Sequence, residues 1–342
     1  MKKTKESPQF FSMTWDFLEE YLPNRVGRSP DTVESYRDSL SLFRRFIVEE
    51  KHISISKFNF ADCTKNCVFD FRDHLMNNGS KPSTVNVRLT AIRAYLNYAA
   101  DREVSVQSVA LLISQVPACK KVLEEKKVIG EDALAALLSA PPQTKMGLRD
   151  RTILVMLYDS AVRLNELLSI RLCDLSLEGE FPNIFVHGKG SKERRVEVTG
   201  FTLEHLRDYL RVFHSNSQTD AYLFSTTIKG VTDKMSPSNV QRIIKQYMQK
   251  IRNENPKLQL PDTVYPHMFR RTRATNLYQD GVAIELVSAI LGHEKIQTTK
   301  IYAKPSVAQL RNAMESVPTP AQHETPLWVG NEGEMARRCG LR

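Results

Sequence analysis

The sequence lacks the features that mark several large classes of protein. It contains no run of about 18 apolar residues, and no apolar stretch follows the N-terminal Met1–Glu6, so it predicts neither a membrane helix nor a secretory signal. The Gly-x-x-x-x-Gly-Lys-Ser/Thr loop that holds nucleotide phosphates is also missing. We therefore expect a cytoplasmic protein that does not associate with membranes and needs no ATP.

Cysteine is scarce as well. The five cysteines are an odd number and are scattered, except for the pair Cys63 and Cys67, which is not the pattern of a disulfide framework. No second Cys or His pair at zinc-finger spacing follows that pair. We therefore expect no metal and no other cofactor.

What the chain does have is length and positive charge. Its 342 residues, 41% hydrophobic and 25% charged, are enough for two domains with cores of their own. A net charge of +9 and a pI near 9.2 favour binding to a polyanion. Nucleic acid is the commonest polyanion for a soluble protein of this kind, so double-stranded DNA is the expected partner.

The first third of the chain is predicted to be helical. After a polar tail of residues 1–10, apolar residues recur at helical spacing through residues 11–116, which indicates a bundle of four or five helices. Four of these helices are expected over residues 11–22, 30–50, 65–76 and 82–101. Pro23 is expected to end the first of them, and Ser29-Pro30 to begin the second.

The start of the 82–101 helix is a candidate phosphate-binding site. Basic, hydroxyl and amide side chains gather there, where backbone N–H groups have no helical partner. They belong to Lys81, Ser83, Thr84, Asn86 and Arg88. Ser83 and Thr84 are equally well explained as helix caps, and both interpretations can hold together.

Residues 117–128 are highly charged, have no apolar face and predict an interdomain linker. A second, mainly helical domain follows over residues 129–316, and a proline-containing arm over residues 317–342 regains helical periodicity only near 332–338. Helices are expected over 131–140, 148–160, 202–213, 237–252, 266–279, 283–291, 296–303 and 306–315. Strands over 183–186 and 194–198 flank a turn at 188–191 and predict a small antiparallel sheet.

The second domain contains the groups needed to break a DNA phosphodiester without a metal. Such a site needs a nucleophile, a cationic clamp for the non-bridging oxygens and an acid for the leaving alcohol. Tyr302 can serve as the nucleophile. Arg163 and Arg270 suit the clamp, because a planar guanidinium binds two phosphate oxygens and stays charged. Lys189 suits the acid, because neighbouring cations can lower its pKa.

The spacing of these residues supports the catalytic interpretation. His267 and Arg270 are three residues apart and share a helix face, and Arg163 and Glu166 have the same separation, so the carboxylate can orient the arginine. Each also has an ordinary alternative, namely a surface ion pair, a helix-capping histidine, a solvated hairpin lysine or a core tyrosine. Near the tyrosine, Gly292 is expected to end one helix and Thr298-Thr299 to cap the next.

In this order the motifs resemble the tyrosine recombinases, the phage integrase family with its Xer-type members. The resemblance covers residues 11–316 and rests on Arg163-x-x-Glu166-Leu167, Gly188-Lys189-Gly190-x-Lys192-x-Arg194, His267-x-x-Arg270, Leu291-Gly292-His293 and Tyr302. It implies a SAM-like helical core-binding domain and a catalytic domain that close as a C-shaped clamp on duplex DNA. It also implies a homo-tetramer on DNA. The free protein is expected to be a monomer or weak dimer, and accessory proteins are possible partners.

The resemblance also implies a role for each residue. Tyr302 attacks the DNA phosphate and forms a 3′-phosphotyrosyl bond. Arg163 and Arg270 hold the phosphate, Lys189 protonates the departing 5′ oxygen, and Glu166 supports Arg163. Because the covalent bond keeps the energy of the broken one, religation needs no ATP, and the arginines supply the charge that a metal provides in other nucleases.

His267 is assigned by the resemblance as acid, base or donor, and His293 as a hydrogen-bond donor to the phosphate. Lys192, Arg194 and Arg271 are expected to contact DNA.

The sequence departs from the family pattern in two places. Position 271 is arginine where many members have histidine, and Ala161-Val162 stands where Gly-Leu is usual. The chain also continues past Val317, and either the helix at 306–315 or the segment 327–338 is expected to dock into a neighbouring protomer.

Three functions remain open. A site-specific recombinase for integration, excision, transposition or dimer resolution is the leading interpretation. A type IB topoisomerase uses similar chemistry as a monomer. A DNA-binding protein that kept the fold and lost the chemistry is the third, and the complete catalytic set argues against it.

Overall fold

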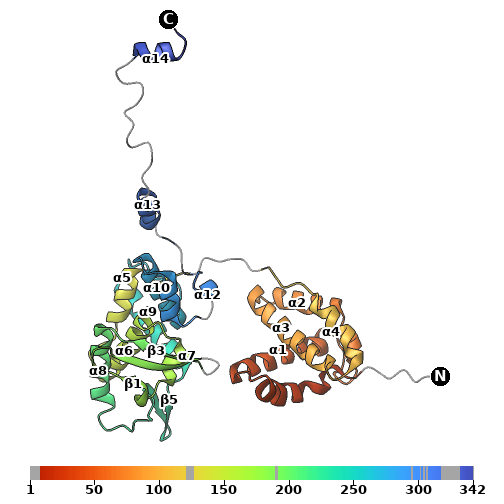
Figure 1. Ribbon diagram of the computed structural model, residues 1–342. Coiled ribbons are helices and arrows are strands. Elements are labelled where there is room, and N and C mark those ends of the chain that lie inside the picture. Colours follow the sequence, from red (N-terminus) through yellow and green to blue (C-terminus); the bar gives the residue numbers. More distant parts are fainter. Residues whose placement is uncertain are drawn as a thin grey trace, which may run out of the picture. The chain divides into compact units, whose positions relative to one another are not determined.

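The computed structural model describes residues 8–120, 127–188, 192–293, 296–300, 302, 305, 307–316 and 332–341, without the side chains of 192, 300 and 308. The chain divides into two compact units, Met1–Glu125 and Lys126–Arg342. The division falls within the stretch expected to be a linker. Figure 1 labels the helices and strands of both units. Among the described residues, no helix has the length and apolar content needed to span a membrane.

The N-terminal unit is a helical bundle, as its apolar spacing predicts. Its α-helices are α1 (Pro30–Glu49), α2 (Lys65–Asn77), α3 (Pro82–Ala100) and α4 (Gln107–Ser114). Short 3₁₀ turns at Phe60–Asp62 and Val104–Val106 precede α2 and α4. The helices begin where the sequence supplies caps or proline: the Thr64 hydroxyl accepts a hydrogen bond from the Cys67 N–H, and Pro30 and Pro82 occupy the first positions of α1 and α3.

The first helical segment differs from the prediction. The chain forms a 3₁₀ turn over Phe10–Met13 and then a π-helix over Asp16–Arg25 that contains Pro23, so Pro23 does not end the helix as expected. In an α-helix the proline ring clashes with the carbonyl four residues back, and the wider π turn relieves that clash. The Val26 N–H bonds to the Tyr21 carbonyl, five residues back, at 3.0 Å.

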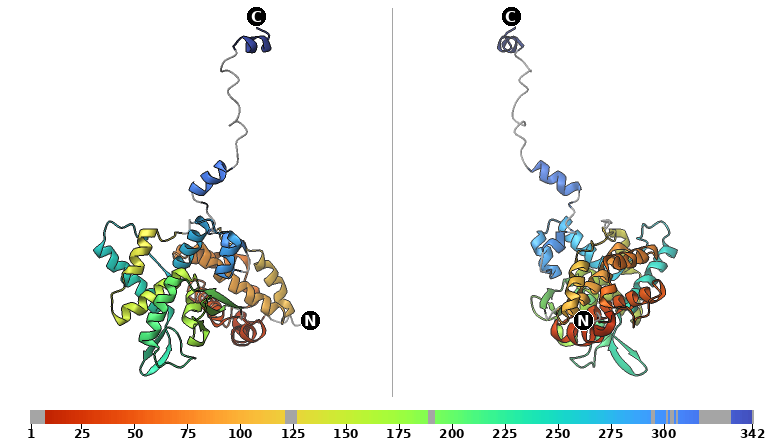
Figure 2. Two further views of the ribbon diagram at one scale, coloured as in Figure 1. Left: turned by 60° about the vertical axis from the view of Figure 1, so that its left-hand side comes forward. Right: turned by 90° about the vertical axis from the view of Figure 1, so that its right-hand side faces the viewer.

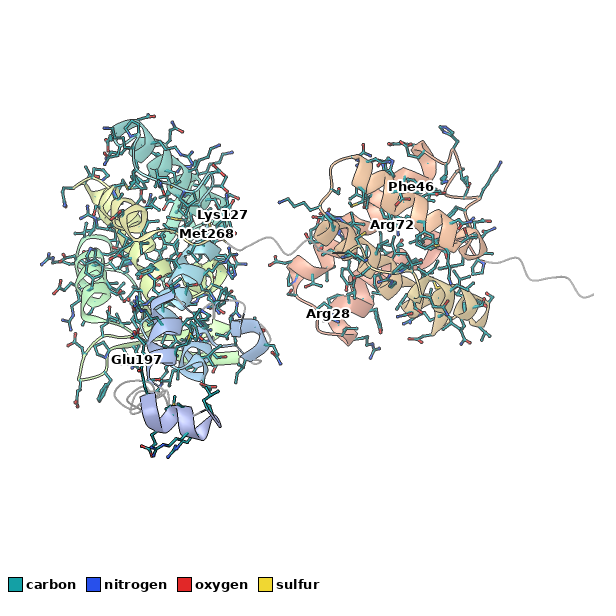
Figure 3. All side chains as sticks on the ribbon, turned by 90° about the horizontal axis from the view of Figure 1, so that it is seen from above. Arg28, Phe46, Arg72, Lys127, Glu197 and Met268 are labelled. Carbon is teal, nitrogen blue, oxygen red and sulfur yellow. The ribbon has the colours of Figure 1, made fainter. Side chains whose placement is uncertain are left out.

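Aromatic rings fill the core of the N-terminal unit. Phe10, Phe43 and Tyr95 are fully buried, and Phe10 meets the other two edge to face at centroid distances of 5.4 and 5.3 Å. The Tyr95 hydroxyl donates to the Phe10 carbonyl, which satisfies the polar end of the ring. Figure 3 draws the side chains of this unit and labels Phe46 of α1, another member of the core. Apolar and aromatic packing therefore holds this unit together.

The C-terminal unit combines helices with two small antiparallel sheets. Its helices are α5 (Glu131–Ser139), α6 (Lys145–Asp159), α7 (Leu164–Ser169), α8 (Gly200–Phe213), α9 (Pro237–Glu254), α10 (Pro266–Gln279), α11 (Ile284–Leu291), α12 (Ile296–Lys300), α13 (Val307–Glu315) and α14 (Glu332–Arg338). Its strands are β1 (Leu175–Ser176), β2 (Asn183–Gly188), β3 (Lys192–Glu197), β4 (Ser225–Ile228) and β5 (Val231–Lys234). The sheets have the orders β1-β2-β3 and β4-β5.

The β4–β5 hairpin is absent from the sequence prediction. Its two-residue turn has positive φ angles at Lys229 and Gly230, +50° and +82°, which matches the twist of a tight hairpin. The hairpin projects from the body of the unit in every view (Figures 1 and 2). Its strands are short and mostly exposed, so they carry little of the apolar alternation by which a strand is recognised.

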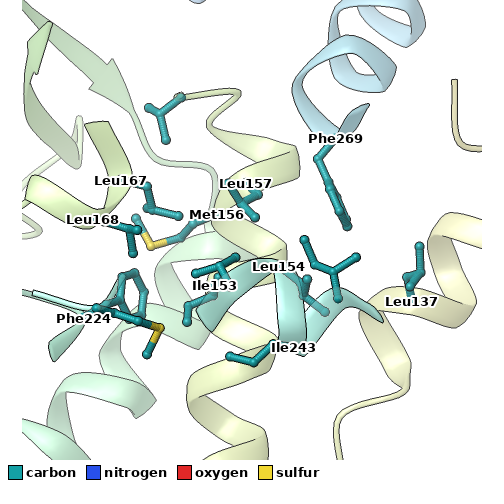
Figure 4. Close-up of a cluster of buried hydrophobic side chains, with 14 of the residues drawn as sticks. Leu137, Ile153, Leu154, Met156, Leu157, Leu167, Leu168, Phe224, Ile243 and Phe269 are labelled. Atoms are coloured by element: carbon teal, nitrogen blue, oxygen red, sulfur yellow. The ribbon is translucent and has the colours of Figure 1, made fainter. Parts of the chain in front are cut away.

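The larger apolar core of this unit lies around α6, the helix that the sequence shows as apolar on nearly all sides. Ile153, Leu154 and Leu157 of α6 are fully buried and pack with Leu137 of α5 and Phe269 of α10. Figure 4 shows Leu154 and Phe269 pointing into this cluster. The core therefore fixes the end of α6 relative to α10, and the polar residues that follow α6 and begin α10 are placed by it.

Candidate active site

Glu166 bridges two arginines from different elements. Its Oε1 accepts a hydrogen bond from Arg163 Nη1 at 2.6 Å, and its Oε2 accepts one from Arg194 Nη2 on β3 at 2.9 Å. Oε2 also accepts from the Arg163 backbone N–H at 2.9 Å, which closes the first turn of α7. Burial by itself raises the pKa of Glu166, but the hydrogen bonds from Arg194 and Arg163 outweigh it and lower the pKa to about 2. The carboxylate is therefore charged at neutral pH and orients both guanidinium groups.

Arg194 was expected to contact DNA, and the structure gives it partners inside the protein. Besides bonding Glu166, it packs against Gly292, the residue that ends α11. A Cβ at Gly292 would lie 2.8 Å from Arg194 Cδ, and the φ of Gly292 is +61°. Both the left-handed backbone and this close approach therefore require glycine at 292.

Arg270 is buried in the C-terminal unit, with 1% of its surface exposed. Its guanidinium donates to the carbonyls of Ala161 and Leu291, and its Nη2 lies 3.0 Å from Nε2 of His293. Its Nε is buried without a hydrogen-bond partner. Burial, reinforced by nearby Arg163, lowers the pKa of Arg270 to about 10, so it stays protonated at neutral pH. Because its three partners are neutral, the site keeps a buried positive charge, which suits an anionic ligand.

Ala161 has a strained backbone next to this charge. Its φ is +49°, a left-handed conformation that residues with a Cβ seldom adopt, and its carbonyl is the one that accepts from Arg270. Glycine adopts this conformation at little cost, which explains the glycine usual in the family at this position. The strained turn points the Ala161 carbonyl at the Arg270 guanidinium, and Arg163 follows two residues later.

His293 lies between Arg270 and Thr299. Its Nδ1 is 2.8 Å from the Thr299 hydroxyl oxygen. Burial, with the charge of Arg270 next in importance, lowers the pKa of His293 to about 4, so the imidazole is neutral at neutral pH. Thr298 and Thr299 were expected to cap a helix. They lie instead inside α12, and Thr299 turns its hydroxyl toward His293.

Tyr302 is buried, 4% exposed, in a small apolar cluster with Ala161, Ala274 and Leu291. Its hydroxyl lies 3.4 Å from Nε2 of His267. Burial raises the pKa of Tyr302, while the charges of Arg270, Arg271 and Arg163 act in the opposite direction. The phenol therefore needs a proton acceptor to become a nucleophile, and His267 is within reach.

Arg271, which was expected to contact DNA, has partners inside the protein. Arg271 is 7% exposed, and its guanidinium donates to the Lys127 carbonyl at 2.9 Å and to the Tyr265 hydroxyl at 3.3 Å; Lys127 is labelled in Figure 3. It therefore ties the start of the C-terminal unit to α10. Lys189 lies outside the described residues, as does the side chain of Lys192.

The predicted DNA-contact residues of α3 fall into two groups. Asn86 pairs with the backbone of Cys119, donating to its carbonyl and accepting from its N–H, and Arg88 donates to the Ser35 carbonyl and to Ser39. These two side chains are committed to the fold of the N-terminal unit. The others, Lys81, Ser83 and Thr84, are exposed. Lys81 occupies the N-cap position, so Ser83 and Thr84 do not cap α3.

Comparison with known proteins identifies the family. Residues 127–309 match the phage integrase family model, and residues 16–103 match the phage integrase N-terminal SAM-like domain. The chain belongs to the phage integrase family. As a member of this family it is a tyrosine recombinase, an enzyme of the site-specific recombinase class.

Relatives of this phage integrase family member cover most of its length. Tyrosine recombinase XerD of Staphylococcus epidermidis is 29% identical over 300 residues, which span 86% of this chain and 95% of the relative. The Tn1549 transposon integrase, solved in complex with transposon right end DNA, superposes with a TM-score of 0.66 at 16% identity, over 89% of this chain and 98% of that one. A lambda integrase tetramer bound to a Holliday junction gives a TM-score of 0.62 at 14% identity, over 85% and 76%. The predicted family and fold class are confirmed.

Proposed function

We propose that this phage integrase family member cuts and rejoins duplex DNA through a covalent bond between Tyr302 and a 3′ phosphate. The observation that carries the proposal is the placement of Tyr302 beside His267, in a cluster of side chains whose Arg270 is a buried cation with neutral partners. A phosphodiester supplies the anion that such a cluster favours. The reaction needs neither a metal nor ATP.

In the cleavage step, the phenol proton of Tyr302 passes to His267 as the phenol oxygen attacks phosphorus. The bond between phosphorus and the 5′ oxygen breaks, and that oxygen takes a proton from Lys189, the acid assigned by the resemblance. Negative charge builds on the non-bridging oxygens, where Arg163 and Arg270 stabilise it. Because hydrogen bonds already hold both guanidinium groups, the protein does not need to reorganise during the reaction. Rejoining is the same step in reverse, with a 5′ hydroxyl as the nucleophile, and conserves the bond energy.

Glu166 is a supporting residue in this mechanism. It touches no reacting atom. Its carboxylate orients Arg163 by accepting two hydrogen bonds, one from the guanidinium and one from the backbone N–H. Both units are proposed to bind duplex DNA, with Lys81 and its exposed neighbours contacting phosphate. Four copies are proposed to act together on two DNA duplexes. The biological outcome is integration, excision, transposition or dimer resolution.

A suicide substrate tests the proposal directly. Such a DNA loses a short strand after cleavage, so the covalent complex accumulates. Wild-type protein is expected to form a denaturant-resistant adduct with and without EDTA. Tyr302→Phe is expected to form none while binding the same DNA with unchanged affinity. The matched control Tyr278→Phe, on α10 and outside the cluster of site residues, is expected to form the adduct normally.

Two results would overturn the proposal. An adduct with Tyr302→Phe would show that another residue is the nucleophile. Strand cleavage that is lost on chelation and restored by magnesium would indicate a metal-dependent nuclease instead.

A further inference from the structure

Thr299 contacts both His293 and Tyr302, two residues of the candidate active site. It is 1% exposed, although the neighbouring Thr298 is exposed. Its hydroxyl is 2.8 Å from Nδ1 of His293, and its backbone carbonyl accepts a hydrogen bond from the Tyr302 N–H at 2.8 Å. One residue therefore contacts the imidazole with its side chain and the nucleophile with its backbone. The ring planes of His293 and Tyr302 are inclined by 29°, and their centroids are 6.2 Å apart.

The polarity of these hydrogen bonds follows from the chemistry of the groups. A guanidinium can only donate, so His293 Nε2, 3.0 Å from Arg270 Nη2, must accept. A neutral imidazole with an accepting Nε2 carries its proton on Nδ1. Nδ1 therefore donates to the Thr299 hydroxyl oxygen. A chain of donation runs from Arg270 through His293 to Thr299.

We propose that Thr299 is a positioning residue of the cleavage reaction. Its hydroxyl accepts from His293 Nδ1 and holds the imidazole in the orientation in which Nε2 meets Arg270, while its carbonyl holds the backbone of Tyr302. This inference rests on the proposed function, because it assigns Thr299 to the same reaction.

The alternative is that Thr299 only packs. It is buried between α12 and the rest of the unit, and a threonine can be retained for its methyl group alone. Valine has the same shape without the hydroxyl oxygen, and serine has the oxygen without the methyl group. The two substitutions therefore separate hydrogen bonding from packing, and Thr298→Val makes the same chemical change at the adjacent exposed position.

The first test measures single-turnover cleavage of the suicide substrate and DNA affinity for each variant. Thr299→Val leaves a buried N–H of His293 without an acceptor, and cleavage is expected to slow by about ten- to a hundredfold. DNA affinity is expected to change little. Thr299→Ser and Thr298→Val are expected to cleave at close to the wild-type rate. Equal loss in the valine and serine variants, or a valine variant as fast as wild type, would overturn the proposal.

The second test needs no activity. Carbon-13 and nitrogen-15 NMR of labelled histidine distinguishes the two neutral tautomers, and His293→Gln identifies the signal of residue 293. Wild type, Thr299→Ser and Thr299→Val are all expected to show the Nδ1–H tautomer, because the donor Arg270 sets it. In Thr299→Val alone the resonance of the Nδ1 proton is expected to move upfield, because its hydrogen bond is lost. An Nε2–H tautomer in wild type would refute the inference. If wild type shows the expected tautomer yet forms no adduct, the proposed function fails and the hydrogen-bond chain stands.

Discussion

Large side chains are buried in different ways in the core of the N-terminal unit and in the active site of the C-terminal unit. In the N-terminal unit, Phe10, Phe43 and Tyr95 pack ring against ring. In the active site of the C-terminal unit, Arg270 is also almost fully buried, but it is held by carbonyls and an imidazole. Aromatic burial stabilises a fold, whereas burying a cation with neutral partners costs free energy. The difference indicates that the buried Arg270 serves to bind an anion rather than to stabilise the fold.

The largest effect is expected from removing the buried cation. Arg270→Met keeps most of the side-chain volume and is expected to reduce cleavage by at least about a thousandfold, since one cationic contact to a transferring phosphoryl group has effects of this size. The free energy of unfolding is expected to fall by less than about 2 kcal/mol, because losing a buried charge offsets the two carbonyls left without a donor.

Single-turnover cleavage and urea denaturation check this prediction together. The neighbour Arg271→Met is the matched control, because it loses bonds to Lys127 and Tyr265 and is expected to keep most of the cleavage activity. Equal cleavage by the Arg270 variant and wild type would remove the contrast between the two units.

The opposite pattern is expected in the N-terminal unit. Phe43→Ala leaves a cavity among the rings and is expected to lower the free energy of unfolding by about 3–5 kcal/mol. Hydrogen–deuterium exchange, resolved by peptide, is expected to place this loss in α1 and α3 and to leave α6 and α10 unchanged. A loss below about 1 kcal/mol would mean that the aromatic cluster does not stabilise the unit.

The smallest effect is expected from removing the charge of Glu166. Unlike Arg270, this buried charge has charged partners, Arg163 and Arg194. Its pKa is depressed from 4.5 to about 2, so its contribution to stability is full above about pH 4.5 and is lost as the pH falls toward 2. By linkage this contribution is about 3 kcal/mol. Glu166→Gln removes it at every pH.

Denaturation of wild type and Glu166→Gln across this range checks the sign. The stability difference between the two proteins is expected to be constant from pH 7 to about 5 and to shrink below that. A difference that stays constant down to pH 2 would show that Arg163 and Arg194 do not hold a charged carboxylate.

The sequence predicted the elements whose signal is local. Apolar periodicity gave α1 and α3, Gly292 gave the end of α11, and the spacing of His267 and Arg270 placed both on α10. The π-helix around Pro23 was missed because tertiary packing, not local propensity, selects the wider turn. The short β1, β4 and β5 strands were missed because few of their residues are buried.

Within the site, the sequence predicted which residues take part better than it predicted their hydrogen-bond partners. Arg194 and Arg271 both read as basic residues available to DNA. Tertiary contacts decide otherwise, since Arg194 bonds a carboxylate 28 residues away and Arg271 a carbonyl 144 residues away. In the sequence, Ala161 was noted only as a departure from the usual glycine and Thr299 only as a helix cap, because a positive φ and a buried hydroxyl are visible only after folding. The roles of the catalytic residues stay predictions.

Mapping the covalent bond tests the central claim most directly. The adduct with a suicide substrate is isolated and digested with trypsin, and the peptide that remains on the DNA is sequenced by mass spectrometry. Because Pro305 blocks cleavage after Lys304, the peptide expected is residues 301–311, with Tyr302 as its only tyrosine. This peptide is expected on a 3′ phosphate, in an adduct formed without metal. A DNA-bound peptide that lacks Tyr302, or attachment through a 5′ phosphate, would contradict it.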